Sequence, residues 1–156
     1  MSSEWQLWVS VLSPTLTLVL TLAGWIFVYR NTNRIAKRAE VFTLVSKGVD
    51  KVVALDRRCA DYWLGAKNPP EPAGGWIAGT SSEIYGLRSI FELLEKYHGF
   101  EGKDTYLSNL RSSATLDAED VSTLSIDVLY ERRSAQVAAV SDALTNLYSY
   151  YRASQD

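Results

Sequence analysis

The chain has 156 residues, of which 47% are hydrophobic, and its formal net charge is −2. One cysteine excludes an internal disulfide and a cysteine-based zinc site, and one histidine excludes a multi-histidine metal site, so we expect no metal and no cofactor. Residues 30–67 hold nine basic and four acidic side chains, whereas residues 68–156 hold seven and thirteen. Because nucleic-acid-binding domains usually carry a strong positive charge, we expect no nucleic-acid polymer as a partner.

An apolar segment near the N-terminus dominates the sequence. Residues 5–29 form a run of 25 residues without one charged side chain. A helix of this length spans about 37 Å, more than the roughly 30 Å hydrocarbon core of a bilayer. Trp5 and Trp8 lie at one end and Trp25 and Tyr29 at the other, where amphipathic rings favour the headgroup layer. The sequence therefore predicts a transmembrane helix within residues 1–30.

The charges that flank this segment predict its orientation. Arg30, Arg34, Lys37 and Arg38 follow it, whereas Glu4 is the one charged side chain before it. Basic residues stay on the cytoplasmic side of a membrane, so we expect a single-pass protein of the inner (plasma) membrane with its N-terminus outside and residues 31–156 in the cytoplasm. The same four basic side chains are candidate contacts with anionic lipid. The simpler interpretation is that they only set the topology.

A cleaved signal peptide is the alternative interpretation of the N-terminal segment. It requires a basic leader, a shorter apolar region and a cleavage site made of small residues. Here the leader is acidic, the apolar run is longer, and Arg30 follows where cleavage is expected. We therefore favour a membrane anchor.

Small and hydroxylated residues recur within the anchor at spacings of three and four. They share one helix face and are Ser10, Ser13, Thr17, Thr21 and Gly24. Such a face lets membrane helices approach closely and form hydrogen bonds with each other, so it predicts a homo-oligomer, in which the polar face could also line a pore. The alternative is that each hydroxyl bonds back to its own helix.

The segment after the anchor has the pattern of a long amphipathic helix that extends to Gly65. Residues 65–79 are rich in proline and glycine, so we expect a loop there, either flexible or docked on the domain. Trp76 and Ile77 within it indicate a hydrophobic contact. We favour a contact with the chain's own domain over one with a partner.

Three further helices are predicted after this loop. The first begins at Thr80, which forms a capping-box pattern with Glu83, and ends at Gly99. A short one covers residues 104–113, and a long one runs from about Asp117 to about Arg152. No segment alternates with period two, so the predicted fold class is all-α: the transmembrane helix followed by a cytoplasmic bundle of two long antiparallel helices and two shorter ones.

The last helix also carries a heptad-like apolar pattern. Its members are Val137, Val140, Leu144, Leu147 and Tyr151. This pattern fits the core of the bundle and equally a seam between subunits.

No catalytic motif is present in the sequence. It contains no glycine-rich phosphate loop, HExxH, CxxC or GxSxG, and a histidine-based triad would have to use His98 at a helix end. We therefore name no catalytic residue and do not expect an enzyme.

Two pairs of arginines are the candidate contacts for an anionic small ligand. Arg57 and Arg58 lie late in the first long helix, and Arg132 and Arg133 lie within the last one. Guanidinium groups gathered from antiparallel helices suit a phosphate-bearing ligand, because each can bind two oxygens. The alternative is that they form surface salt bridges, for which the candidate partners are Asp61, Asp127 and Glu131.

The layout of anchor, basic segment and helical domain resembles that of small single-pass membrane effectors of bacterial antiphage defence. The resemblance implies a cytoplasmic domain that senses a nucleotide or an infection signal and then perturbs the membrane. It rests on the arrangement of the whole chain and on no diagnostic motif. Two hypotheses follow: an oligomeric membrane-associated effector or regulator, and a passive anchor or adaptor that localises a protein partner.

Overall fold

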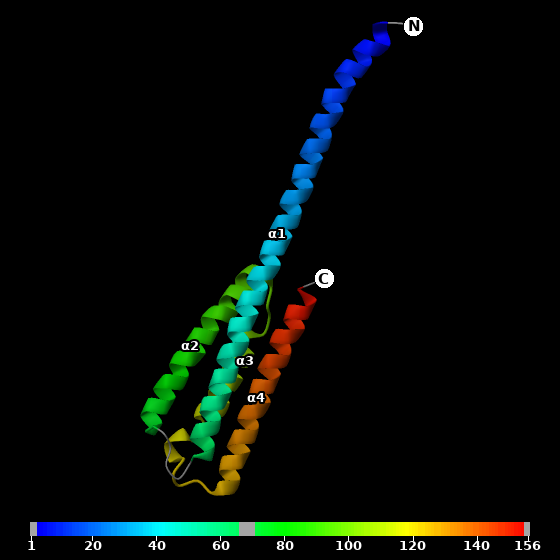
Figure 1. Cartoon of the computed structure of the whole chain (residues 1–156). Helices are drawn as coiled ribbons and strands as arrows, with labels where there is room; N and C mark the ends of the chain where they lie inside the picture. Colours follow the sequence, from blue (N-terminus) through cyan, green and yellow to red (C-terminus); the bar gives the residue numbers. More distant parts are fainter. Residues whose placement is uncertain (1–2, 66–70, 155–156) are drawn as a thin grey trace. The chain divides into compact units, whose positions relative to one another are not determined.

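In the computed structural model the backbone is described for residues 3–65 and 71–154, and side chains are described from residue 14 onward within these ranges. The described chain forms helices α1 (Ser3–Leu64), α2 (Ala73–His98), α3 (Lys103–Thr115) and α4 (Ile126–Ala153), with a short 3-10 helix, η1 (Ala118–Asp120) (Figure 1). No strand occurs in the described ranges, so the all-α prediction is confirmed. The chain divides into two compact units, Met1–Ala39 and Glu40–Asp156, and each is described by itself.

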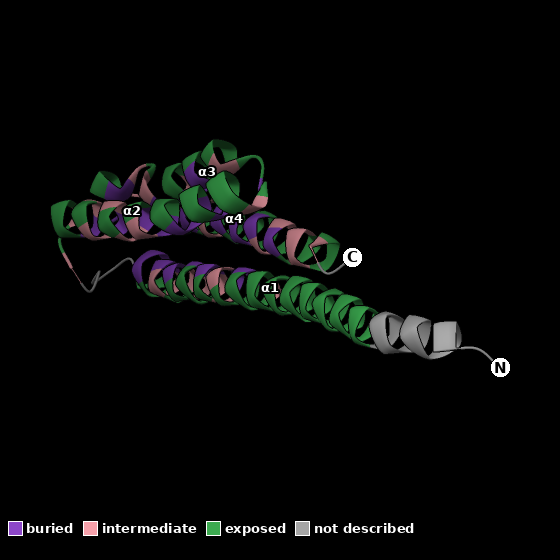
Figure 2. Ribbon diagram, turned by 90° about the horizontal axis from the view of Figure 1, so that it is seen from above, coloured by how far each residue is buried: buried purple, intermediate pink, exposed green. Residues whose placement is uncertain are grey.

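The first unit is the N-terminal part of α1. Residues 31–33, which follow the predicted anchor, are helical and belong to α1. Every described side chain from residue 14 to residue 37 is exposed, and burial in α1 begins only in its C-terminal half (Figure 2). Among the described residues, no helix is long and apolar enough to cross a bilayer. Residues 5–13 of the predicted span lie outside the described side chains.

The second unit, Glu40–Asp156, is an antiparallel helical bundle. Each helix runs opposite to the one before it in the chain (Figure 1). Asp56 of α1 pairs with Arg133 of α4, and farther along the two helices the ring of Phe42 lies 5.8 Å from that of Tyr151. The predicted antiparallel packing of the first and last long helices is therefore confirmed.

The apolar faces of all four helices meet in one core. α1 contributes Val52, Leu55 and Cys59, and α2 contributes Leu87 and Phe91. α3 contributes Leu107 and Leu110, and α4 contributes Val140, Ala143 and Leu147, among others. This packing follows the three-to-four spacing of apolar residues in the sequence, because such spacing places them on one side of a helix.

The structure corrects the predicted loop at residues 65–79. Helix α2 begins at Ala73 with Pro72 as its N-cap residue, so Trp76 and Ile77 belong to a helix and not to a loop. Thr80 is fully buried inside α2 and does not cap it. Residues 66–70 of the predicted loop lie outside the described residues.

The reason for this correction is tertiary packing. Glycine costs about 1 kcal/mol relative to alanine within a helix, so Gly74, Gly75 and Gly79 argue locally against one. Trp76 is completely buried, however, and its burial outweighs a penalty of this size. The contact of Trp76 with its own domain is confirmed.

The predicted start of the last helix is also wrong. Asp117 has a left-handed backbone (φ 61°) and precedes η1, whereas α4 begins at Ile126 with Ser125 as its N-cap, and the Ser125 hydroxyl accepts a hydrogen bond from the Val128 amide. The acidic residues after Asp117 therefore open a single 3-10 turn, whose residue Ala118 is buried in the core. Helix α2, with 26 residues, is nearly as long as α4, with 28, so the prediction that it is one of two shorter helices is wrong. The predicted short helix is confirmed as α3.

The buried cysteine leads to a first testable prediction. Burial raises the pKa of the Cys59 thiol to about 12. Since the thiolate is the reactive form, we expect Ellman's reagent at pH 8 to react with the native chain at least about a thousandfold more slowly than with the denatured chain. A Cys59→Ser variant supplies the zero-reaction control. Rapid labelling of the native chain would show that α1 opens locally around this residue.

Candidate functional site

The four arginines predicted to bind an anionic ligand lie in the bundle, but they are engaged in different ways. Arg58 donates hydrogen bonds to Glu71 (2.5 Å) and Glu83 (3.0 Å). Arg57 is exposed on the surface of α1.

The other two arginines, on α4, also contact carboxylates. Arg132 pairs with Asp117 at 2.6 Å, and Arg133 donates to Asp56 at 2.6 Å and to the side-chain oxygen of Gln136. The partners thus differ from the candidates named on sequence grounds. An anion bound by Arg58, Arg132 and Arg133 would have to displace these carboxylates, so ligand binding at the arginine pairs stays a prediction.

Arg58 has a clear structural setting. Its guanidinium lies over the ring of Trp76, 4.8 Å from the ring centroid, and the ring of Tyr62 stacks on Trp76 with centroids 4.2 Å apart. Burial lowers the pKa of Arg58, but its hydrogen bonds to Glu71 and Glu83 outweigh this and hold the pKa above its ordinary value. Arg58 of α1 therefore holds α1 against α2 through its contacts with Glu83 and Trp76.

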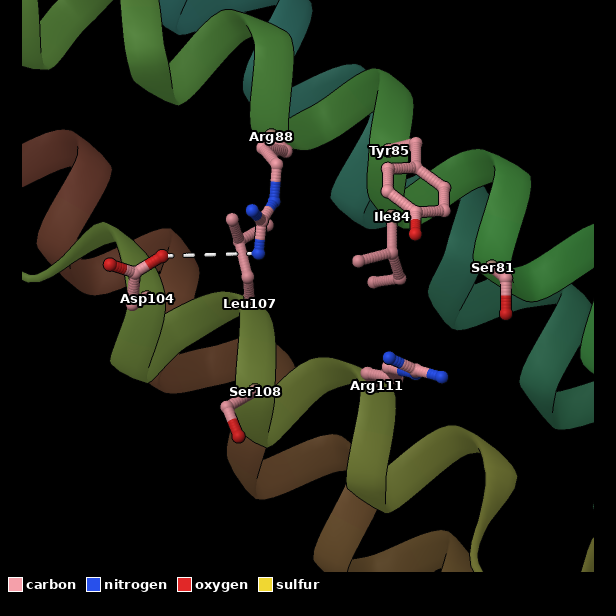
Figure 3. Close-up of a pocket in the computed structure, with 8 residues that line it drawn as sticks. All are labelled: Ser81, Ile84, Tyr85, Arg88, Asp104, Leu107, Ser108 and Arg111. Carbon is pink, nitrogen blue, oxygen red and sulfur yellow. Dashed lines mark ion pairs between the residues drawn. The ribbon is translucent and has the colours of Figure 1, made fainter.

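A cavity that sequence reasoning missed lies between α2 and α3. It has a volume of about 240 Å³ (Figure 3). Its wall on α2 carries Ser81, Tyr85 and Arg88, and its wall on α3 carries Ser108 and Arg111. The buried side chains of Ile84 and Leu107 form its apolar floor, and Asp104 contributes a carboxylate.

Helical spacing explains why these side chains converge. Residues 81, 85 and 88 lie on one face of α2, and residues 104, 108 and 111 lie on one face of α3. The two faces meet because the neighbouring positions Ile84 and Leu107 are buried in the core. The spacing i, i+4, i+7 of these side chains could have shown in the sequence that each set lies on one helix face. No sequence pattern shows that the face on α2 adjoins the face on α3.

The electrostatics of the cavity favour an anion. Arg88 and Asp104 are 3.9 Å apart, and their side chains are 47% and 78% exposed, so this is a weak surface pair. Within the described part of the chain, Arg111 has no carboxylate partner. The cavity thus holds two guanidinium groups against one carboxylate.

The predicted association face can be followed only in part. On α1 the hydroxyl of Thr21 donates to the carbonyl oxygen of Thr17 at 2.8 Å, which is the back-bonding considered as the alternative. At Gly24 an added Cβ would meet no atom within 4 Å. Ser10 and Ser13 lie outside the described side chains.

The predicted lipid-contacting residues all lie on α1. Arg30, Arg34 and Lys37 are exposed, and Arg38 is half-buried. Lipid contact by these residues stays a prediction.

The described residues contain no group of three or more potential metal ligands. Comparison of the chain with protein-family models, with curated proteins and with solved structures gives no match.

Proposed function

We propose that this chain is a single-pass membrane protein whose bundle, Glu40–Asp156, lies in the cytoplasm and acts as a membrane-associated effector or regulator. One observation supports the proposal above all others. The large apolar side chains of the N-terminal part of α1 are exposed on every side of the helix: Leu16, Leu18, Val19, Leu20, Leu22, Trp25, Ile26, Phe27, Val28 and Tyr29.

Exposure of this kind is costly in water. Leu20, Trp25 and Phe27 are 63%, 71% and 72% exposed, whereas the apolar side chains that form the core of the bundle are at most 8% exposed. Burying one such side chain is worth about 1.5–3 kcal/mol. A helix that is apolar all round is stable when lipid or neighbouring helices surround it. The uncharged run of the sequence extends back to Trp5, which supports lipid as the surroundings of this part of α1.

The proposed action follows from this placement. The chain self-associates through the anchor face that includes Thr17 and Thr21, and the assembly perturbs the membrane or acts on partner proteins there. The trigger is a phosphate-bearing ligand or a protein signal. This is the behaviour that the resemblance to antiphage effectors implies, so bacterial defence is the proposed setting.

The test is overproduction of the full chain in bacteria, with growth and membrane potential as readouts. An effector should halt growth and depolarise the cells, and Thr17→Leu with Thr21→Leu should relieve both effects because the bulky side chains prevent close helix approach. Thr15→Leu is the matched control: it makes the same exchange on the opposite side of the helix and should leave both effects intact. Toxicity that the double variant retains would overturn self-association through this face.

A passive adaptor is the second candidate, and a feature of α4 favours it. Four large apolar side chains on this helix are exposed: Ile126, Tyr130, Val137 and Tyr148. Exposed apolar side chains of this size can receive a protein partner. An adaptor should be tolerated on overproduction.

The oligomeric state separates the two candidates further. We expect light scattering in mild detergent to show a defined oligomer of the full chain and a smaller species for a chain that begins at Asn33. A monomer in both cases would favour the adaptor.

A further inference from the structure

We infer that the cavity between α2 and α3 is a binding site for a phosphomonoester, with Arg88 and Arg111 as its anion-binding residues. This inference deepens the proposed function, because it supplies a site for the phosphate-bearing trigger. The cavity is a different site from the arginine pairs at residues 57–58 and 132–133, which the sequence predicted to bind an anionic ligand.

The arginines of the bundle differ in how closely they are paired with carboxylates. Arg58, Arg132 and Arg133 lie 2.5–3.0 Å from carboxylates, with side chains 28%, 27% and 18% exposed. Arg88 has a carboxylate no nearer than 3.9 Å, and Arg111 has no ion pair with any described residue. The three engaged arginines hold helices together, whereas the two in the cavity keep donors free for a ligand.

Both helices direct polar side chains toward the cavity. Figure 3 shows the guanidinium groups of Arg88 and Arg111 in the space between α2 and α3, with the hydroxyl of Tyr85 pointing into the same space. Ser81 adds a hydroxyl on the α2 wall. Guanidinium groups can bind phosphate oxygens in pairs, and hydroxyls can donate to the remaining oxygens.

The size and polarity of the cavity limit the ligand that it can enclose. Its volume of about 240 Å³ is below the roughly 300–1,000 Å³ that is usual for sites enclosing a drug-sized ligand. It can therefore enclose a phosphate and one small group, while the rest of a larger ligand stays outside. The ring of Tyr85 and the buried floor of Ile84 and Leu107 favour an apolar or aromatic group next to the phosphate.

Asp104 provides a way to test this assignment by a gain of affinity. Its carboxylate lies beside Arg88 and repels a bound anion. Two unit charges about 4 Å apart interact by about 1 kcal/mol in water, which corresponds to about fivefold in affinity. Asp104→Asn should therefore tighten phosphate binding by about fivefold, an effect that a merely structural role for these residues would not produce.

The experiment measures binding of inorganic phosphate and phenyl phosphate to the full-length chain in mild detergent by isothermal titration calorimetry. We expect both to bind, phenyl phosphate more tightly. Arg88→Gln and Arg111→Gln should each weaken binding by about tenfold or more, as expected for the loss of hydrogen bonds to a charged group. Arg152→Gln makes the same change in charge on an exposed arginine of α4 and should leave affinity unchanged.

The outcomes separate the sources of the ligand. In a second experiment, the protein is placed in nanodiscs without detergent and floated with vesicles of phosphatidic acid or of phosphatidylcholine. Co-flotation with the phosphatidic acid vesicles alone shows that a lipid phosphomonoester binds, and the arginine variants show whether it uses the same side chains. Binding that Arg88→Gln and Arg111→Gln abolish, with either the soluble or the lipid phosphate, supports the site. Equal losses with Arg152→Gln, or binding that survives both cavity variants, would overturn it.

Two measures keep these outcomes unambiguous. Circular dichroism verifies that each variant retains its helical content, since all four altered residues are exposed and should not affect folding. The readout involves neither growth nor membrane potential. A failure of phosphate binding therefore leaves the proposed membrane function standing, and tolerance of overproduction leaves the binding site standing.

Discussion

Trp76→Ala should lower the free energy of unfolding of the bundle by about 3–5 kcal/mol, the usual range for truncating a buried large aromatic side chain. Trp76 has no exposed surface and lies where three parts of the chain meet. Its ring packs against Tyr62 of α1, and its indole N–H donates to the carbonyl oxygen of Ala114 at the end of α3, at 2.9 Å. Truncation thus removes a ring stack and a hydrogen bond together with the buried apolar area.

The measurement is chemical denaturation of the full-length chain in mild detergent, followed by circular dichroism. Trp76→Phe is the informative comparison, because it keeps a ring against Tyr62 but leaves the buried carbonyl of Ala114 without its donor. We expect it to cost about 1–3 kcal/mol, between the wild type and Trp76→Ala. A loss below about 1 kcal/mol for Trp76→Ala would mean that the start of α2 does not hold α1 and α3 together.

Gly79→Ala should destabilise the bundle by about 1–2 kcal/mol, although alanine is the better helix former by about 1 kcal/mol. A Cβ at residue 79 would lie within 3.0 Å of three atoms of the Arg58 guanidinium group. That group is held by Glu71, Glu83 and the ring of Trp76. The guanidinium would have to leave these partners, and hydrogen bonds to charged groups contribute roughly 1.5–3 kcal/mol each before solvent screening reduces them.

Gly86→Ala is the matched control on the same helix. A Cβ there would approach the terminal Nζ of Lys51 at 3.1 Å, and a flexible lysine end can move aside. We expect this variant to be neutral or more stable than wild type.

A second comparison isolates the role of Arg58. In an Arg58→Gln background, Gly79→Ala should no longer destabilise, because the atoms that obstruct the new Cβ are gone. The same denaturation experiment measures all of these variants. A destabilisation of the same size in the Arg58→Gln background would show that the cost of Gly79→Ala arises elsewhere.

The sequence by itself determined the class of the fold and most helix ends. The amphipathic pattern through Val52, Leu55 and Cys59 predicted the buried face of α1, because apolar residues three and four apart share one side of a helix. Gly99 was correctly predicted to end α2, where it adopts a left-handed backbone (φ 74°) that glycine accepts at little cost. The uncharged N-terminal run and the basic residues after it are likewise properties of the sequence, and they carry the proposal of a membrane anchor.

Tertiary structure alone decided where α2 and α4 begin and which charges meet. Local signals at Thr80 and Asp117 resembled helix caps, but burial of Trp76 and Thr80 extended α2 backward, and burial of Ala118 fixed a separate 3-10 turn. The carboxylate partners of Arg58 and Arg133 lie 13–77 residues away in sequence, so no local pattern predicts them. The cavity between α2 and α3 has the same origin: each helix supplies one arginine, and the packing of Ile84 and Leu107 into a common core brings the two together.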